Sequence, residues 1–203
     1  MTAPRGERAD VVAVLTEQHR ELERALSEVL KLPPGDSRRR SHLKDTAVAL
    51  AGHTTATQCH LHHAVRRYLP HDGDRLVRQQ DTDLLHAEEA MKDLEFTGVD
   101  SGEFDTLVRQ LIRRVRRHSV REEASLFPRL RGSTPAAVLD ELGDAVREVG
   151  AQAACLRSEV EHSRRPDVIG RIRAALAPDD ARAAPQAEQF DRFLTGDGDL
   201  SGI

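Results

Sequence analysis

The chain has 203 residues, of which 38% are hydrophobic and 32% charged, and its formal net charge at pH 7 is −4. This length suits one domain with an appended tail, and the slightly acidic balance argues against nucleic acid or an anionic membrane as a partner. Trp is absent and only five Phe and one Tyr occur, so the core must consist of Leu, Val and Ala, which suits helices packed on helices.

Clusters of Pro and Gly divide the chain into segments whose apolar residues recur every three or four positions, the period of an α-helix. The predicted helices span residues 10–31, 36–69, 74–95, 102–130 and 135–161. Thr134 is expected to cap the fifth helix, with Pro135 at its first position. Short connections make consecutive helices antiparallel, so the sequence predicts an all-α, up-down-up-down four-helix bundle with an additional C-terminal helix and a partly flexible tail.

The expected organisation has three parts: a bundle over residues 1–134, an additional helix packing on it over residues 135–165, and a partly disordered extension over residues 166–203. Within the extension, DVIGRIRAALA and AEQFDRFL are predicted to form short amphipathic helices and GDGDLSGI to fray. A protein partner is expected to use this extension.

The two cysteines, Cys59 and Cys155, form no CxxC pair, so neither a disulfide framework nor a zinc knuckle is expected. The first residues lack the apolar stretch of a signal peptide, and no apolar run approaches the ~20 residues that span a bilayer. We therefore expect a cytoplasmic protein.

Each of the first four helices carries a histidine on or near its apolar stripe: His19, His53, His86 and His118. A single such histidine is more often a core residue satisfied by one hydrogen bond. Four imidazoles in one bundle are costly to bury unless each nitrogen finds a partner, and a metal ion satisfies them together. Glu122, four residues after His118, projects from the same helix face. Imidazoles with a carboxylate in a bundle core are ligands for iron or manganese.

The second and fourth helices also resemble each other at an offset of 65 residues. This alignment pairs His53 with His118, Leu50 with Val115, Leu61 with Leu126, and Thr57 with Glu122. The bundle therefore looks like a duplicated helix pair with a pseudo-twofold site between its halves.

The sequence resembles the hemerythrin-like (HHE cation-binding) domain family, particularly its actinobacterial-type members, over residues 10–142. The matching pieces are DVVAVLTEQHRELE, the first histidine of HTTATQCHLHHAVRRYLP, LLHAEEAMKDLE and HSVREEASLFPRLR. The last fits the family pattern H-x-x-x-E-E-x-x-L-F-P at every named position.

The resemblance implies a non-haem di-iron centre that binds, senses or reacts with dioxygen, nitric oxide or peroxide, or that senses iron or redox state. Its metal ligands would be His19, His53, His86, His118 and Glu122. His19 and His53 would lie mainly beside one iron and His86 and His118 beside the other, with Glu122 bridging them or binding one.

The sequence departs from the family at Thr57, where a glutamate is expected, and a hydroxyl neither neutralises charge nor spans two metals well. A di-iron centre, a single-metal site, a weakly held pair and a metal-free helical scaffold that acts as an interaction module all stay open. Turnover of peroxide or nitric oxide would need an open coordination position, which the missing carboxylate could supply.

Nearby residues give weaker indications. Helical geometry places His60 only about 20° around the helix from His53 but about two turns further along, and it places His62 and His63 on the surface or flank. Glu89, three residues after His86, is a candidate for an extra ligand or for an acceptor that orients a histidine.

Overall fold

The computed structural model describes residues 9–161 and 167–177, and these contain helices but no strand. The elements are α1 (Val11–Lys31), α2 (Arg38–Ala56), η1 (Thr57–Leu61), α3 (His62–Tyr68), α4 (Gly73–Phe96), α5 (Gly102–Arg121), η2 (Glu122–Leu126), α6 (Phe127–Ser133), α7 (Ala136–Cys155), α8 (Arg157–Glu161) and α9 (Val168–Leu176), where η marks a π-helical turn. None of the helices in these ranges is both long and apolar enough to cross a membrane.

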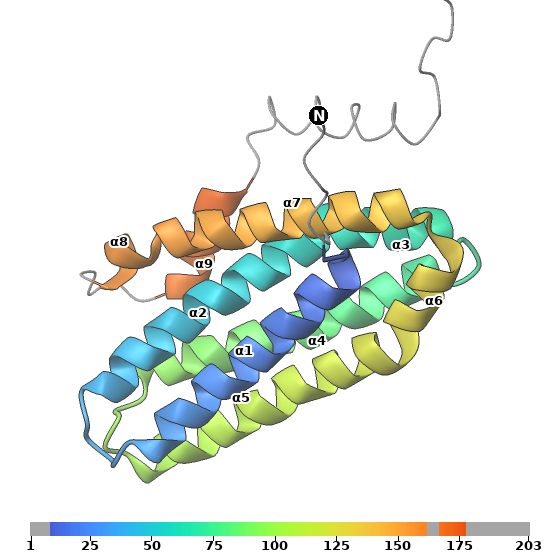
Figure 1. The fold of residues 1–203 in the computed structure, drawn as a ribbon. Coiled ribbons are helices and arrows are strands. Elements are labelled where there is room, and N and C mark those ends of the chain that lie inside the picture. Colours follow the sequence, from blue (N-terminus) through green and yellow to red (C-terminus); the bar gives the residue numbers. More distant parts are fainter. Residues whose placement is uncertain (1–8, 162–166, 178–203) are drawn as a thin grey trace, which may run out of the picture.

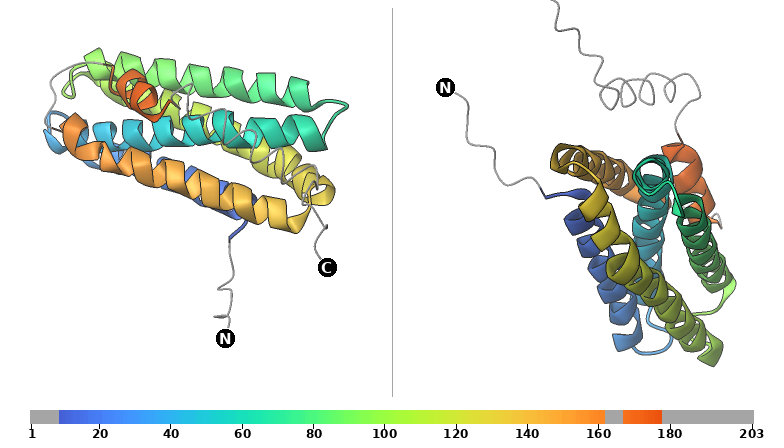
Figure 2. Two further views of the ribbon diagram at one scale, coloured as in Figure 1. Left: turned by 90° about the horizontal axis from the view of Figure 1, so that it is seen from above. Right: turned by 90° about the vertical axis from the view of Figure 1, so that its right-hand side faces the viewer.

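Four rods form an antiparallel bundle: α1, α2–η1–α3, α4 and α5–η2–α6 (Figure 1). The rod of α1 packs against α2 and α5, and α4 packs against α5 and α3. Outside the bundle, α7 covers the edge between α1 and α2, while α9 lies against α2 and α4 (Figure 2). The predicted all-α, up-down-up-down bundle with an additional C-terminal helix is confirmed.

The apolar core is divided into two clusters along the bundle. One contains Leu22 of α1, Leu50 of α2 and Val115 of α5. The other contains Leu15 of α1 and Leu126 of η2. On three of the four rods a buried histidine falls between the two clusters: His19 of α1, His53 of α2 and His118 of α5. A polar layer therefore crosses the middle of the bundle.

The two π-helical turns occupy equivalent places in the internal repeat, since η1 and η2 begin 65 residues apart. A π turn holds one more residue than an α turn, which rotates the following side chains by about 100° relative to an uninterrupted α-helix. The expected surface position of His62 is therefore wrong: its side chain is buried, whereas His63 is exposed.

The fifth helix of the sequence prediction is α7 followed by α8, with a break at Leu156. The expected cap is wrong, because α7 starts after Pro135 and Thr134 instead closes α6, its backbone N–H donating to the carbonyl of Leu130 (2.9 Å). Close approach of α7 to α2 requires Gly52, where an added Cβ would lie 2.9 Å from Ala153 Cβ.

The segment DVIGRIRAALA forms α9, as predicted, and buries Val168, Ile169 and Ile172. The expectations for AEQFDRFL and GDGDLSGI fall outside the described residues.

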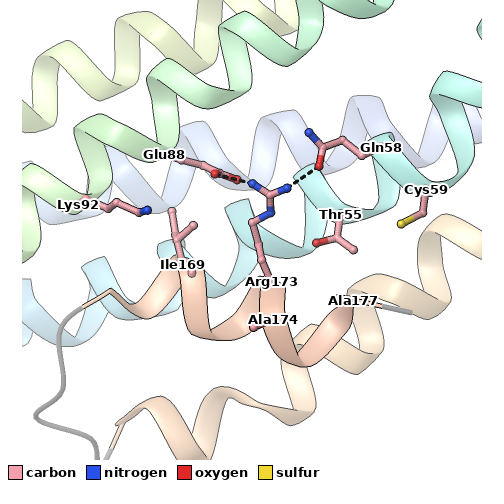
Figure 3. A pocket seen from close by; sticks show the side chains of 10 residues that line it. Thr55, Gln58, Cys59, Glu88, Lys92, Ile169, Arg173, Ala174 and Ala177 are labelled. Atoms are coloured by element: carbon pink, nitrogen blue, oxygen red, sulfur yellow. Dashed lines mark hydrogen bonds and ion pairs between the residues drawn. The ribbon is translucent and has the colours of Figure 1, made fainter. Parts of the chain in front are cut away.

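A guanidinium fastens α9 to the bundle (Figure 3). Arg173 donates to Glu88 Oε2 of α4 (2.8 Å) and to Gln58 Oε1 of η1 (2.5 Å). Glu88 is buried, and Arg173 is the basic side chain that neutralises it among the described ion pairs. A cavity of about 460 Å³, also lined by Cys59 and Lys92, remains between α9, η1 and α4.

Arg173→Ala is expected to lower the free energy of unfolding by about 1–3 kcal/mol, because the Glu88 carboxylate stays buried without its counter-charge. Chemical denaturation measures the change. Adding Glu88→Gln should restore part of the loss, since a neutral amide tolerates burial better than a carboxylate. Unchanged stability of Arg173→Ala would contradict this role.

Candidate metal centre

Four buried side chains from three rods converge in the polar layer. They are His19 of α1, His53 of α2, His118 of α5 and Glu122 of η2. One nitrogen or oxygen from each lies within 4.8 Å of all the others. Each of the four side chains belongs to a residue that is at most 4% exposed, so water offers them little solvation.

The three imidazoles turn the same atom, Nε2, toward this point. His53 Nε2 lies 3.1 Å from His118 Nε2. The carboxylate oxygen Oε2 of Glu122 lies 3.1 Å from His19 Nε2 and 3.5 Å from His118 Nε2. The rings meet edge to face, with centroids 5.1 to 5.4 Å apart. Three nitrogens and one oxygen therefore face a common centre.

Acceptors outside the cluster hold two of these rings in place. His19 Nδ1 lies 2.9 Å from Glu123 Oε1, and His53 Nδ1 lies 3.0 Å from Gln18 Oε1. Both partners offer an oxygen, which favours a proton on each Nδ1. A neutral ring in this tautomer presents its Nε2 lone pair to the centre, as binding a metal ion requires. The helix α7 lies beside the Gln18 amide at Gly150, where an added Cβ would be in ordinary contact with Gln18 Nε2 (3.6 Å).

The charge of Glu122 is balanced by imidazoles and not by a lysine or arginine. Its ion-pair partners among the described residues are His19 and His118. Burial alone would raise the pKa of Glu122, but the neighbouring His118 charge and the hydrogen bond from His19 outweigh burial and hold that pKa at about 2.

The histidines divide into two groups. Burial lowers the pKa of His53 and of His118, and the positive charge that His19 can carry lowers both further. Burial also disfavours the charged form of His19, but Glu122 and Glu123 outweigh it and raise the pKa of His19. Without a metal ion, His19 is therefore the imidazole that takes up a proton to balance Glu122.

These residues fit a transition-metal ion. A cation at their centre would bind the two imidazole nitrogens that face each other, His53 Nε2 and His118 Nε2. It would also neutralise the buried carboxylate of Glu122. Imidazole and carboxylate ligands suit iron, manganese and zinc. Among the residues described, this is the one group of three or more His, Cys, Asp or Glu side chains with such spacing.

The structure does not bring His86 into the cluster. Its side chain is exposed on α4, and the expectation that it points toward the bundle axis is wrong. The buried face of α4 steps from Gln80 through Leu84 and Ala87 to Met91, so position 86 falls to one side of it. Glu89 is also exposed and lies outside the cluster.

The position equivalent to Glu122 in the other half of the repeat holds no carboxylate. Thr57 is fully buried there, and its hydroxyl has no hydrogen-bond partner in the described ranges. The described side chains thus offer no carboxylate opposite Glu122 for a second metal ion.

Two further histidines lie near the layer. His62 is buried with Nδ1 3.7 Å from Asp81 Oδ1, and its pKa is lowered by burial although Asp81 and Glu122 partly oppose the shift. His60 is partly buried. Burial lowers the pKa of His60, and the negative charge of Glu148 on α7 partly opposes this shift. Neither belongs to the ligand cluster.

Sequence reasoning missed Gln18 and Glu123 as the groups that contact the outer nitrogens of the cluster histidines His53 and His19. Both were within reach of a sequence signal. Gln18 precedes His19, and Glu123 is the second glutamate of the H-x-x-x-E-E pattern. No periodicity, however, reports which neighbour an outer imidazole nitrogen meets.

A cavity of about 380 Å³ opens between α1 and α5 and reaches His19 from outside the bundle. It is lined by His19, Arg20, Glu23, Arg24, Ser119, Val120 and Glu123. Solvent in this cavity therefore reaches the outer side of the His19 ring, whose inner side faces the centre of the cluster.

Stability of the metal-free protein should fall on acidification below the ordinary histidine pKa of 6.5. The unfolded chain binds protons at His53 and His118 before the folded protein does, because their folded pKa values are lowered. His19 acts in the opposite sense, because its pKa is raised in the folded protein. Protonation of His19 stabilises the fold fully below pH 6.5, and this stabilisation is lost as the pH rises through the folded-state pKa of His19. As pH falls from 4.5 toward about 2, Glu122 loses its contribution too.

Urea denaturation at a series of pH values measures this dependence. The variant Glu122→Gln should lose less stability than wild type below 4.5, because the share of Glu122 is absent while Asp36 and Asp72, whose pKa values are also lowered to about 2, keep theirs. A wild-type stability that stays constant or rises between pH 6.5 and 4.5 would contradict the expected balance.

Thr57→Glu is expected to lower the free energy of unfolding by several kcal/mol, because it places a second carboxylate in a buried layer that holds no further cation. Thermal denaturation measures the loss. The matched control Thr57→Val should be neutral or stabilising, since the Thr57 hydroxyl has no partner among the described groups. A Thr57→Glu protein that keeps its stability and binds two metal ions would show instead that the site lacks only this ligand.

The chain matches a family model described as the hemerythrin HHE cation binding domain over residues 10–130. No curated protein and no solved structure matches the chain. The matched residues run from the cap of α1 to the last turns of α6, so they include all four rods and every member of the buried cluster. With more than half of its length matched, the chain belongs to the hemerythrin HHE cation-binding domain family.

Proposed function

We propose that this protein binds one non-haem iron ion through His19, His53, His118 and Glu122, and uses it to bind, sense or react with dioxygen, nitric oxide or peroxide. The observation that carries the proposal is the convergence of three inward-facing Nε2 atoms on one buried carboxylate oxygen. Membership of a cation-binding family supports the same assignment.

Bound iron would supply a redox couple and a coordination position for a small ligand. The protein's own residues would neutralise part of the metal charge through Glu122 and hold the imidazoles rigidly. Phe127 stacks on His19 with the rings 6.0 Å apart and 2° from parallel, which restricts rotation of that ligand. Apolar side chains on both sides of the layer exclude bulk water from the centre.

The absence of a carboxylate at Thr57 and the exposed position of His86 favour one ion over a di-iron pair. A ligand set of three nitrogens and one oxygen also leaves room for an exogenous ligand if the ion prefers five or six coordination. The competing function is a metal-free scaffold that acts as an interaction module, in which the histidines are satisfied by the contacts to Glu122, Glu123 and Gln18.

Metal analysis separates these functions. Protein produced with iron and freed of surface-bound metal should retain about one iron ion per chain, because the buried ligands are preorganised. Glu122→Gln keeps the side-chain shape but removes the charge and should lose most of the iron, and His53→Ala should do the same. His86→Ala is the matched control and should retain the wild-type content.

Wild-type protein that retains well under half an ion per chain would favour the scaffold. If His86→Ala lost as much iron as His53→Ala, the four-residue ligand assignment would be contradicted. His86 would then return to the ligand set, as the sequence resemblance implied. Circular dichroism of each variant establishes that it is folded.

A further inference from the structure

We propose that Glu123 is a positioning residue that holds the ligand His19 in its metal-binding orientation, and that the cavity between α1 and α5 is the side from which solvent and small solutes approach the centre. The metal part of this inference rests on the proposed function. The family match assigns no role to Glu123, and Glu123 is not one of the four residues of the buried cluster.

The geometry links solvent to the centre through two side chains. Glu123 has 40% of its side chain exposed, whereas the His19 side chain is 1% exposed. Glu123 Oε1 lies 2.9 Å from His19 Nδ1, and the opposite ring atom, Nε2, lies 3.1 Å from Glu122 Oε2. Consecutive residues on a helix point about 100° apart, which lets Glu122 enter the bundle while Glu123 reaches the outer edge of the same imidazole.

The three ligand histidines differ in what holds their outer nitrogen. His19 faces a carboxylate and His53 faces the neutral amide of Gln18. His118 Nδ1 has no hydrogen-bond partner among the residues described. A carboxylate draws the Nδ1 proton toward itself and makes Nε2 a stronger donor to a metal. His19 is therefore the ligand whose basicity the protein raises most.

The other charges that line the cavity are engaged elsewhere. Glu23 accepts from Arg116 of α5 (2.8 Å), and Arg24 donates to Glu17 (2.6 Å). Glu123 is the lining carboxylate that contacts His19. Glu23 thus provides a matched control, because it lies in the same cavity and touches no ligand.

Titration of the full-length metal-free protein with Co²⁺ tests the metal-binding part. Glu123→Ala should bind Co²⁺ about 10–100-fold more weakly than wild type, in line with the loss of an acceptor that orients a ligand. Glu123→Gln keeps an oxygen acceptor without the charge, so its affinity should be intermediate and its visible Co²⁺ spectrum should shift. Glu23→Ala should match wild type in both properties. Equal affinity of Glu123→Ala and Glu23→Ala would overturn the inference.

The proton on His19 Nδ1 gives a readout that needs no metal. Nuclear magnetic resonance of the metal-free protein should show this proton exchanging slowly in wild type and in Glu23→Ala, and rapidly in Glu123→Ala. If wild type binds no Co²⁺, the proposed function fails, and slow exchange still supports the orienting contact. Rapid exchange in wild type would refute the contact whatever the metal result, and thermal denaturation establishes that the three variants are folded.

Discussion

The rest of the structure depends on one buried negative charge. Glu122 lies in the middle of a bundle whose ends are apolar, and no lysine or arginine pairs with it among the described residues. A carboxylate in this environment is strongly destabilising unless positive charge comes close. The protein surrounds it with imidazoles, each of which can accept either a proton or a metal ion. The same four side chains therefore destabilise the metal-free fold and have the chemistry of a metal-binding site.

The polar layer is positioned by backbone geometry as well as by side-chain choice. Glu122 begins η2, and Thr57 begins η1 at the equivalent place in the repeat. Wide π turns are frequent at functional sites because they redirect side chains that a regular helix would place elsewhere. Here both halves contain the turn, although only one carries the carboxylate. The backbone of the layer is thus two-sided, whereas its buried negative charge lies on one side.

Helical periodicity was sufficient to find every member of the buried cluster. His19, His53, His118 and Glu122 all interrupt apolar stripes, and the structure buries all four together. The same reasoning failed for His86, because the buried face of α4 runs through Leu84 and Ala87 and leaves residue 86 to one side of it. It failed for His62 because the π turn η1 shifts the phase of the residues that follow it, and the regular α-helical period used for the prediction contains no such turn. Thr134 was misassigned because α6 and α7 lie so close in sequence that one residue decides which helix it ends or begins.

The helix α7 changes what counts as the smallest complete unit of this protein. The family match ends at residue 130, before α7 begins, and yet it contains every member of the ligand cluster. Gln18, which orients His53, has α7 against its amide at Gly150. A fragment cut at the family boundary would keep all four cluster side chains but would remove the helix that lies against Gln18, the support of one of them. The bundle together with α7 is consequently a better unit than the matched residues alone for grafting or redesign.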